Sequence, residues 1–149
     1  MIRIICVGKI KEKYFVSAIK EYMKRLSRYT KIDVVEIPDE SNAEKAVKIE
    51  GDKILDKIKK DEYVIAMDIG GNMISSLDFS KKINTLFNTT SKITFVIGGS
   101  YGLSGEVKKR SNYQLSFSKM TFPHQLFRVI LLEQIYRAYK INNNETYHK

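Results

Sequence analysis

Residues 116–125, SFSKMTFPHQ, form an unusual junction between a predicted strand and a predicted helix. Such turns are normally polar and rich in Gly, Asn or Asp. Here the apolar side chains could wall a slot of the size of an adenine ring, and the residues between them offer hydroxyl and backbone hydrogen bonds. The apolar set is Phe117, Met120 and Phe122, and the polar set is Ser118, Lys119 and Thr121. The alternative is that the aromatic rings belong to the core and Thr121 caps a helix begun by Pro123.

Two further features follow predicted strands. The glycine-rich segment 98–102, GGSYG, comes after an apolar run, and its glycines allow the backbone to approach a flat or phosphorylated ligand. Its spacing differs from G-x-G-x-x-G and the chain has no P-loop motif, so a tight turn is an equal interpretation. Asp68 ends another apolar run, where its carboxylate could bind a ribose hydroxyl or cap the following turn.

The side chains most used in catalysis are scarce. The chain has two histidines, His124 and His148, and one cysteine, Cys6. A Ser-His-Asp hydrolase would need one of these histidines within reach of an exposed serine on a strained elbow. The cysteine spacings of structural zinc are absent, so we expect no metal. Cys6 lies in an apolar run and is expected in the core. His148 follows Tyr147 in the last four residues, where disorder is the usual expectation.

Alternating strand and helix patterns must position these residues. Short apolar runs predict strands at 2–8, 32–37, 63–69, 93–99 and 113–117. Helical spacing predicts helices at 11–28, 41–58, 75–87 and 123–141, with a short candidate at 106–110. We expect a capping box from Ser41 to Glu44, and a turn at 70–72 that closes the third strand.

Strands separated by helices predict an α/β domain with a mainly parallel sheet and helices on both faces, over residues 1–149. Open sheets of this kind bind ligands beyond the carboxyl ends of their strands. The segment 116–125, the glycines at 98–102 and Asp68 all lie at such ends, so we expect them to converge on one site.

The charge of the chain indicates an anionic partner. The net charge is +9, and it amounts to +5 over residues 1–38, −2 over 39–90 and +6 over 91–149. If the two basic parts meet on one face, their Lys and Arg side chains could replace the counterions of a phosphate backbone, although solubility is the simpler reading. No stretch reaches the roughly 20 apolar residues of a membrane span, and MIRIICVGK does not resemble a signal peptide, so we expect a cytoplasmic protein without a membrane partner.

The last predicted helix is apolar nearly all round between Leu126 and Tyr139. A monomer of 149 residues cannot easily bury every side of a terminal helix, which favours a homodimer interface. The alternative is a helix wedged entirely within one subunit.

Four segments together resemble one protein family over the whole chain. They are IICVGKIKEKY at 4–14, VIGGSYG at 96–102, RSNYQLSFSKMTFPHQLFRVILLEQIYRAYKI at 110–141 and the final YHK. This pattern is similar to the bacterial ribosomal RNA large subunit methyltransferase H family of the SPOUT superfamily. The resemblance implies a homodimer with a C-terminal trefoil knot. It also implies transfer of a methyl group from S-adenosylmethionine to the 3-position nitrogen of a pseudouridine in 23S rRNA of the ribosome.

The resemblance also implies site residues. The family's methyl-donor contacts correspond here to Met67, Gly98 and the segment of Phe117, Ser118, Lys119, Met120, Thr121 and Phe122. Met67 replaces the family's usual Leu, a side chain of similar volume. We expect Tyr147 and His148 to be catalytic and to close over the target base from the second subunit. Arg128 and Arg137 are candidates for RNA or interface contacts, with internal salt bridges as the alternative.

The sequence departs from the family at two places. The polar segment around residues 39–43 is shortened, and Asn144 and Thr146 stand where the family often has Gly and Pro before its Tyr-His. Two other function classes stay open from the residues alone. A noncatalytic RNA-binding module would explain the charge, and a dinucleotide-dependent oxidoreductase would explain the glycines, although these are misplaced for one.

Overall fold

The computed structural model describes all 149 residues and places five strands in one sheet. The strands are β1 (Ile2–Val7), β2 (Ile32–Ile37), β3 (Tyr63–Met73), β4 (Ile93–Ile97) and β5 (Tyr113–Ser116). They lie in the order β2-β1-β4-β3-β5, and each neighbouring pair is parallel. The predicted parallel α/β architecture is confirmed.

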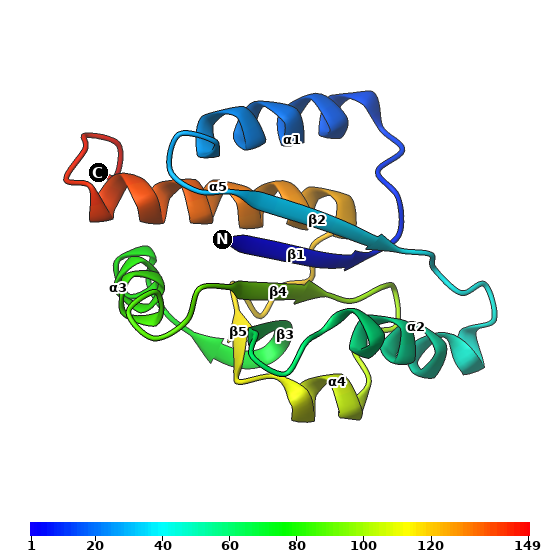
Figure 1. Cartoon of the computed structure of the whole chain (residues 1–149). Coiled ribbons are helices and arrows are strands. Elements are labelled where there is room, and N and C mark those ends of the chain that lie inside the picture. Colours follow the sequence, from blue (N-terminus) through cyan, green and yellow to red (C-terminus); the bar gives the residue numbers. More distant parts are fainter.

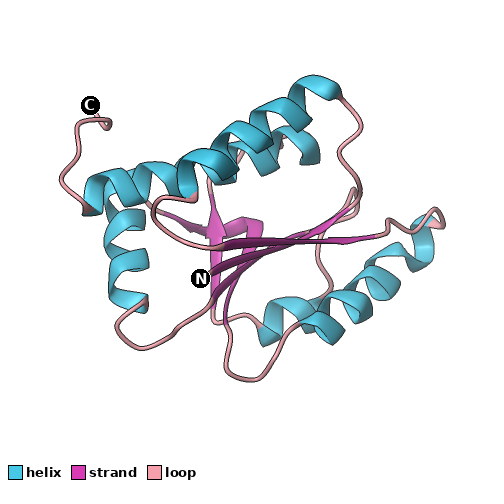
Figure 2. Cartoon of the chain, turned by 45° about the horizontal axis from the view of Figure 1, so that its top comes forward, coloured by secondary structure: helices cyan, strands magenta, loops and turns pink.

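Helices cover both faces of the sheet (Figures 1 and 2). They are α1 (Lys13–Leu26), α2 (Ala43–Lys57), α3 (Ser76–Leu86), α4 (Gly105–Arg110) and α5 (His124–Asn142). The larger core cluster joins α1, α3 and α5 to one face, and the smaller cluster joins α2 and α4 to the other. Because α1 and α5 lie side by side, the two basic parts of the chain do meet.

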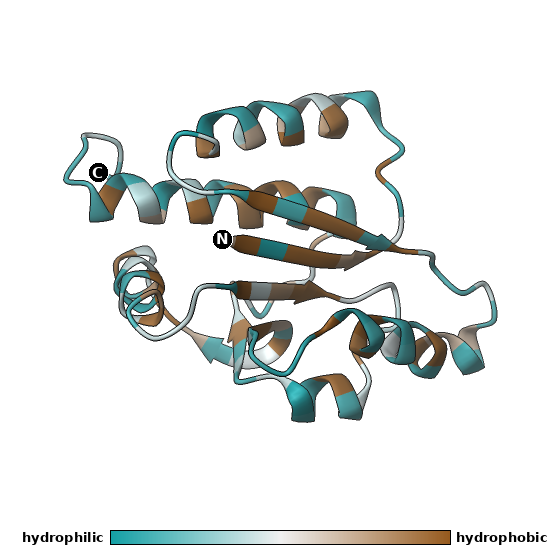
Figure 3. Ribbon diagram, in the orientation of Figure 1, coloured by the Kyte–Doolittle hydropathy of each residue, from teal (hydrophilic) through white to brown (hydrophobic).

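The strands are buried because both faces are covered. All five residues of β4 are buried, as are five of the six in β1, and Figure 3 shows both strands as apolar along most of their length. Continuous apolar runs are typical of parallel strands enclosed by helices on both sides. Helices α1 and α2 instead alternate apolar and polar residues, because only one side of each contacts the sheet.

Two local predictions were wrong. Residues 70–72 do not end β3 as a turn: the strand continues to Met73 through a bulge, and both Met67 and Asn72 pair with Leu115 of β5. The N-cap of α2 is Asn42, whose side chain accepts a hydrogen bond from the backbone of Glu44, in place of the predicted Ser41. Asn and Ser are nearly equivalent caps, so the sequence could not decide between neighbours.

Helix α5 packs between α1 and α3 above the sheet (Figure 1). None of its residues from His124 to Asn142 is exposed. Three neighbours within one subunit therefore account for most of its apolar surface, as the wedged-helix alternative expects. Its composition alone consequently gives weaker support to a homodimer than the sequence indicated.

None of the five helices combines the length and the apolar character that a membrane crossing requires.

Candidate active site

A cavity of about 310 Å³ opens at the carboxyl ends of β3, β4 and β5. Its walls come from the end of β3, the loop after β4, the segment after β5 and the start of α5. Seven of the eight predicted donor-binding residues line it: Met67, Gly98, Phe117, Ser118, Met120, Thr121 and Phe122. Lys119 belongs to the same segment but is exposed and does not line the cavity. The position of the cavity agrees with the rule that open parallel sheets bind ligands at these strand ends.

The glycines of the loop after β4 permit a tight backbone turn. The amide of Gly102 donates to the carbonyl of Gly99 over 3.0 Å, and Gly102 has a φ of 84°. A Cβ atom on Gly98 would lie 3.0 Å from the carbonyl carbon and oxygen of Gly102. Side chains are therefore excluded where the loop folds on itself, and the backbone forms this side of the cavity.

Aromatic contacts hold the segment after β5 in place. The ring of Phe117 lies 5.4 Å from that of Phe127 on α5 and 6.3 Å from that of Phe79 on α3. Phe122 stacks on Phe127 with ring centroids 6.3 Å apart. Phe117 thus contacts the core and lines the cavity at once. Met120, by contrast, is 77% exposed at the rim.

Hydroxyl groups shape the same segment. The hydroxyl of Ser116 donates to the carbonyl of Ser118, and the Ser118 hydroxyl accepts from the amide of Met120. Thr121 forms no side-chain hydrogen bond to the start of α5, and that helix has no side-chain cap. The capping alternative for Thr121 was wrong, and its hydroxyl is free to meet a ligand.

Polar side chains stand at the edge of the cavity. Asp68 lines it, and one carboxylate oxygen lies 3.6 Å from the ammonium nitrogen of Lys108 on α4. His124 Nε2 lies 3.3 Å from the hydroxyl oxygen of Ser100. Both His124 and Ser100 line the cavity, so this histidine joins the loop after β4 to the start of α5.

The C-terminal tail folds back onto the far end of α5. The Tyr147 hydroxyl donates to Oε1 of Glu133 over 2.5 Å, and the Tyr147 ring packs edge-on against Tyr136. The Arg137 guanidinium lies over the Tyr147 ring and donates to Nδ1 of His148 over 3.1 Å. Burial, followed by the contact with Glu133, raises the pKa of Tyr147 to about 12. The structure thus brings the two predicted catalytic residues together, but away from the cavity.

The separation follows from helix geometry. Arg137 lies ten residues after Phe127, and at about 1.5 Å per residue the two positions are roughly 15 Å apart along α5. Phe127 lines the cavity, whereas Arg137 holds His148. The tail of one subunit therefore does not reach the cavity of the same subunit in this conformation.

Arg128 and Cys6 both have roles within the subunit. The Arg128 side chain is buried, donates to Glu36 over 2.7 Å and also donates to the carbonyl of Gly8. This supports the salt-bridge alternative for Arg128 and ties α5 to the ends of β1 and β2. Cys6 is 1% exposed, and burial raises its pKa to about 11, as expected for a core thiol.

Sequence reasoning missed some cavity residues. Leu103, Phe127 and His124 line the cavity together with the predicted residues. Leu103 and Phe127 resemble ordinary core residues, and no local pattern separates them from the core. Glu133, which holds both Tyr147 and Arg137, could have been found because it lies four residues before Arg137 on a helix.

Comparisons with known proteins show to which family the chain belongs. The family described as "Predicted SPOUT methyltransferase" matches residues 1–148. A solved structure titled as a probable methylase family protein from Haemophilus influenzae Rd KW20 superposes with a TM-score of 0.60 at 18% identity, covering 99% of this chain and 70% of that one. This likeness concerns the fold alone. Fold and family match together define the class as a SPOUT methyltransferase.

Named relatives identify the family within this class of methyltransferases. Ribosomal RNA large subunit methyltransferase H of Clostridium tetani is 56% identical and that of Clostridium novyi 57% identical, each over 99% of both chains. A putative enzyme of the same name from Methanococcus maripaludis is 54% identical over the same shares. The chain therefore belongs to the ribosomal RNA large subunit methyltransferase H family. SPOUT methyltransferases use S-adenosylmethionine as the methyl donor.

The lengths of these alignments concern the segment that was expected from the sequence to be shortened. They span 157 positions, whereas the chain has 149 residues, so the relatives contain residues that this chain lacks. A shortened segment was expected around residues 39–43, between β2 and α2.

Proposed function

We propose that this protein transfers the methyl group of S-adenosylmethionine to the 3-position nitrogen of a pseudouridine in 23S rRNA. The observation that carries the proposal is the cavity, which gathers seven of the eight predicted donor residues from three separate parts of the chain. Family membership supplies the reaction class. The basic charge of both terminal parts suits a ribosomal RNA partner, the large subunit or the assembled 70S ribosome, in the cytoplasm.

The residues present suit a nucleoside with a sulfonium side chain. Phe117, Phe122 and Leu103 provide apolar walls for a base, and Asp68 offers a carboxylate to ribose hydroxyls. The loop at Gly98 offers backbone groups at close range. We assign donor binding to Met67, Gly98 and Phe117 through Phe122. Lys119 is the weakest member, because it is exposed and does not line the cavity.

The bound donor would supply a methyl carbon activated by its positive sulfur. The chain's own contribution is to hold the methyl carbon and the target nitrogen in line, which can account for much of a rate enhancement. The target nitrogen must also lose its proton. Direct transfer requires no metal, and no group of His, Cys, Asp and Glu residues in the structure is arranged to hold one.

We propose that the tail acts across a homodimer. In one subunit Tyr147 and His148 lie beside Arg137, on the second half of α5, whereas the cavity lies at its start. A second subunit could place its tail over the first subunit's cavity and so complete the site. While Nδ1 of His148 accepts a hydrogen bond from Arg137, a neutral His148 ring must carry its proton on Nε2. In that state Nε2 can only donate a hydrogen bond. This contact suits an orienting role, and release from Arg137 would let His148 accept the proton.

We further propose that residues 1–149 form one domain whose C-terminal part is tied in a trefoil knot. Strand β5 lies at one edge of the sheet, yet α5 starts beside the end of β1, three strands away. There Gln125 accepts from the backbone of Lys11, and Arg128 donates to Gly8 at the end of β1. The connecting segment must therefore cross the carboxyl ends of β3 and β4, close to the loop after β4. A knot would resist complete unfolding by pulling from both ends and would leave a residual loop in a single-molecule force measurement.

The decisive test combines binding and nucleoside mapping. Calorimetry should show binding of S-adenosylmethionine by the purified protein, and no heat would favour a noncatalytic RNA-binding module. Methylated nucleosides should then be mapped in 23S rRNA from cells with and without the gene. Loss of one 3-methylpseudouridine on deletion, restored by the gene, is the expected result. An unchanged modification pattern would contradict the proposal.

A further inference from the structure

A second pocket, of about 300 Å³, lies on the other side of the β3 bulge. It is polar and is lined by Gly70, Gly71, Asn72, Ser111, Asn112, Tyr113 and Gln114. These residues come from the end of β3, from the connection between α4 and β5, and from the start of the edge strand β5 itself. None of them belongs to the donor cavity.

The bulge connects the two hollows. Met67 and Asn72 both pair with Leu115, so residues 68–71 are pushed out of the ladder. Asp68 and Ile69 of this bulge line the donor cavity, whereas Gly70 and Gly71 line the second pocket. A Cβ atom on Gly71 would lie 2.7 Å from the carbonyl carbon of Gln114, so only glycine allows the bulge to pack this closely on β5. A ligand that reaches the donor cavity therefore has the second pocket next to it.

Three amide side chains leave hydrogen-bonding groups free in the second pocket. Asn72 uses its Nδ2 to donate to the carbonyl of Gln114, which leaves its Oδ1 without a protein partner. Asn112 uses its Oδ1 to accept from the amide of Val64, which leaves its Nδ2 free. The Gln114 amide has no protein partner, so all three side chains offer free donors or acceptors to a ligand. Such groups can bind the Watson–Crick edge of an unpaired base.

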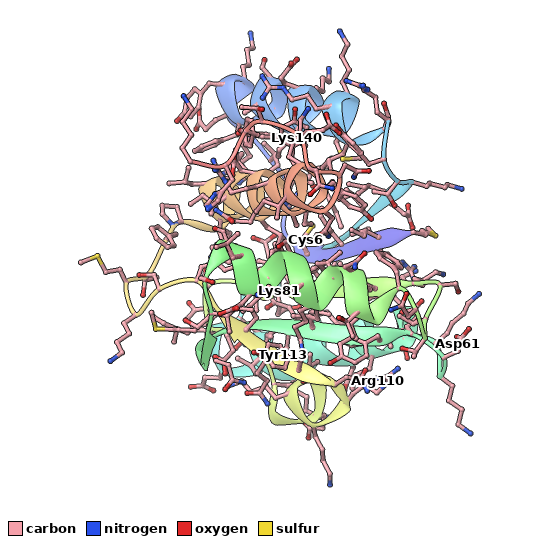
Figure 4. The ribbon with its side chains drawn as sticks, turned by 90° about the vertical axis from the view of Figure 1, so that its left-hand side faces the viewer. Cys6, Asp61, Lys81, Arg110, Tyr113 and Lys140 are labelled. Atoms are coloured by element: carbon pink, nitrogen blue, oxygen red, sulfur yellow. The ribbon has the colours of Figure 1, made fainter.

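Positive charge lies beside the pocket. The Lys82 ammonium of α3 lies 3.8 Å from the centre of the Tyr113 ring, and Lys109 is an exposed residue in the last turn of α4. Neither lysine forms a salt bridge. Figure 4 shows Tyr113 of β5 between Lys81 on α3 and Arg110 at the end of α4. Cations on both sides of a polar pocket suit a base whose flanking phosphates need neutralisation.

We propose that the second pocket binds a nucleotide of single-stranded RNA that neighbours the base to be methylated. The free amides contact the base edge, and the lysines of α3 and α4 contact the phosphates on either side. The bulge then sets the distance between this nucleotide and the target base. The inference rests on the proposed function, because it takes the substrate to be RNA.

Gln114 provides the cleanest test, since its side chain has no structural hydrogen bond to lose. Gln114→Ala removes the free amide, and Gln114→Glu keeps the shape but adds a negative charge. Asn88→Ala is the matched control, because Asn88 is exposed, makes no side-chain hydrogen bond and lies just beyond the far end of α3. Each variant is assayed for thermal unfolding, for S-adenosylmethionine affinity and for methyl transfer to ribosomes that lack the modification.

For Gln114→Ala we expect the KM for ribosomes to rise by about 5- to 10-fold, because one or two net hydrogen bonds are lost. Donor affinity and thermal unfolding should stay unchanged. Gln114→Glu should show a larger rise because its carboxylate repels phosphate. If both variants match Asn88→Ala, the inference is overturned.

Failure of the proposed function would show separately, as absence of methyl transfer by the wild-type protein. Fluorescence anisotropy with a labelled single-stranded oligoribonucleotide then tests the pocket directly. Weaker binding by Gln114→Glu than by Asn88→Ala supports the pocket, and equal binding overturns it.

Discussion

Phe122 connects the cavity to the helix behind it. Its ring lines the cavity and stacks on Phe127, and the segment before it has hydroxyls and backbone groups but few charges. An apolar wall beside a few polar groups is the usual composition of a site for a small ligand. The residues most important for donor binding are therefore expected to be sensitive to charge and tolerant of apolar replacement.

Phe122→Asp should weaken S-adenosylmethionine binding by at least about 10-fold, because a carboxylate in the apolar wall must lose hydration when the donor binds. Phe122→Leu serves as the control and should keep most of the affinity. Calorimetry measures both variants, and circular dichroism checks that each is folded. Equal affinities for Phe122→Asp and the wild type would remove Phe122 from the donor site.

The raised pKa of Tyr147 leads to a prediction about pH. With a pKa of about 12, this phenol keeps its proton throughout the neutral range. Its contact with Glu133 contributes fully below pH 10, the ordinary pKa of tyrosine, and is lost as the pH rises toward 12. Tyr147 therefore cannot be the group that accepts the proton of the target base near neutral pH.

Tyr147→Phe should accordingly lower the rate of methyl transfer without moving the pH dependence of kcat between pH 6 and 9, about the neutral range in which only a histidine normally titrates. His148→Ala is the comparison, since a proton acceptor lost there would change the profile. Single-turnover assays across this range give the measurement. A displaced profile in Tyr147→Phe would mean that the phenol takes part in proton transfer.

At the scale of elements, the loop after β4 is held against α2. Glu50 of α2 is 3% exposed, its Oε2 accepts from the backbone of Glu40, and its Oε1 has no partner. A Cβ atom on Gly99 would lie 2.8 Å from that Oε1, and one on Gly51 would lie 2.5 Å from the Ser104 hydroxyl oxygen. The sequence alone indicates only that Gly51 weakens a helix. In the structure its missing side chain allows the cavity loop to pack closely on α2.

Gly99→Ala should destabilise the protein by about 1–3 kcal/mol through overpacking and should also lower donor affinity, because the displaced loop lines the cavity. Gly105→Ala is the control, since its Cβ would meet nothing within 4 Å. Thermal unfolding and donor calorimetry on both variants provide the readouts. Normal donor binding by a destabilised Gly99→Ala would show that the loop does not contribute to the site.

The sequence predicted elements better than it predicted their contacts. Runs such as ITFVI identify a strand because parallel strands enclosed by helices are apolar throughout. Residues 70–72 were predicted as a turn, since glycine favours turns and bulges alike, and only the pairing of Asn72 with Leu115 shows that β3 continues past a bulge. The donor segment was found through a family pattern. The placement of the tail depends on Glu133 and Arg137, and nothing in the tail itself indicates that contact.

At the scale of the whole molecule, the cavity lies at the start of α5, and the tail packs on the second half of the same helix, from Glu133 onward. A site divided in this way can work in a dimer with a twofold axis, because the tail of each copy can then reach the cavity of the other copy. A monomer would have to release the tail from Glu133 and Arg137 and extend it along α5. These two arrangements make different predictions for mixed dimers.

Co-expression of two inactive chains separates them. Phe122→Asp has a defective cavity and an intact tail, whereas deletion of residues 147–149 leaves an intact cavity without a tail. If the tail acts across the dimer, random pairing makes half of the dimers mixed, each with one complete site of two, so activity should recover to about a quarter of the wild-type value. If the tail acts within its own subunit, every site lacks one part and activity stays absent. Differently tagged chains, purified in tandem to isolate the mixed dimer, should then show about half of the wild-type activity per dimer, because one site of two is complete.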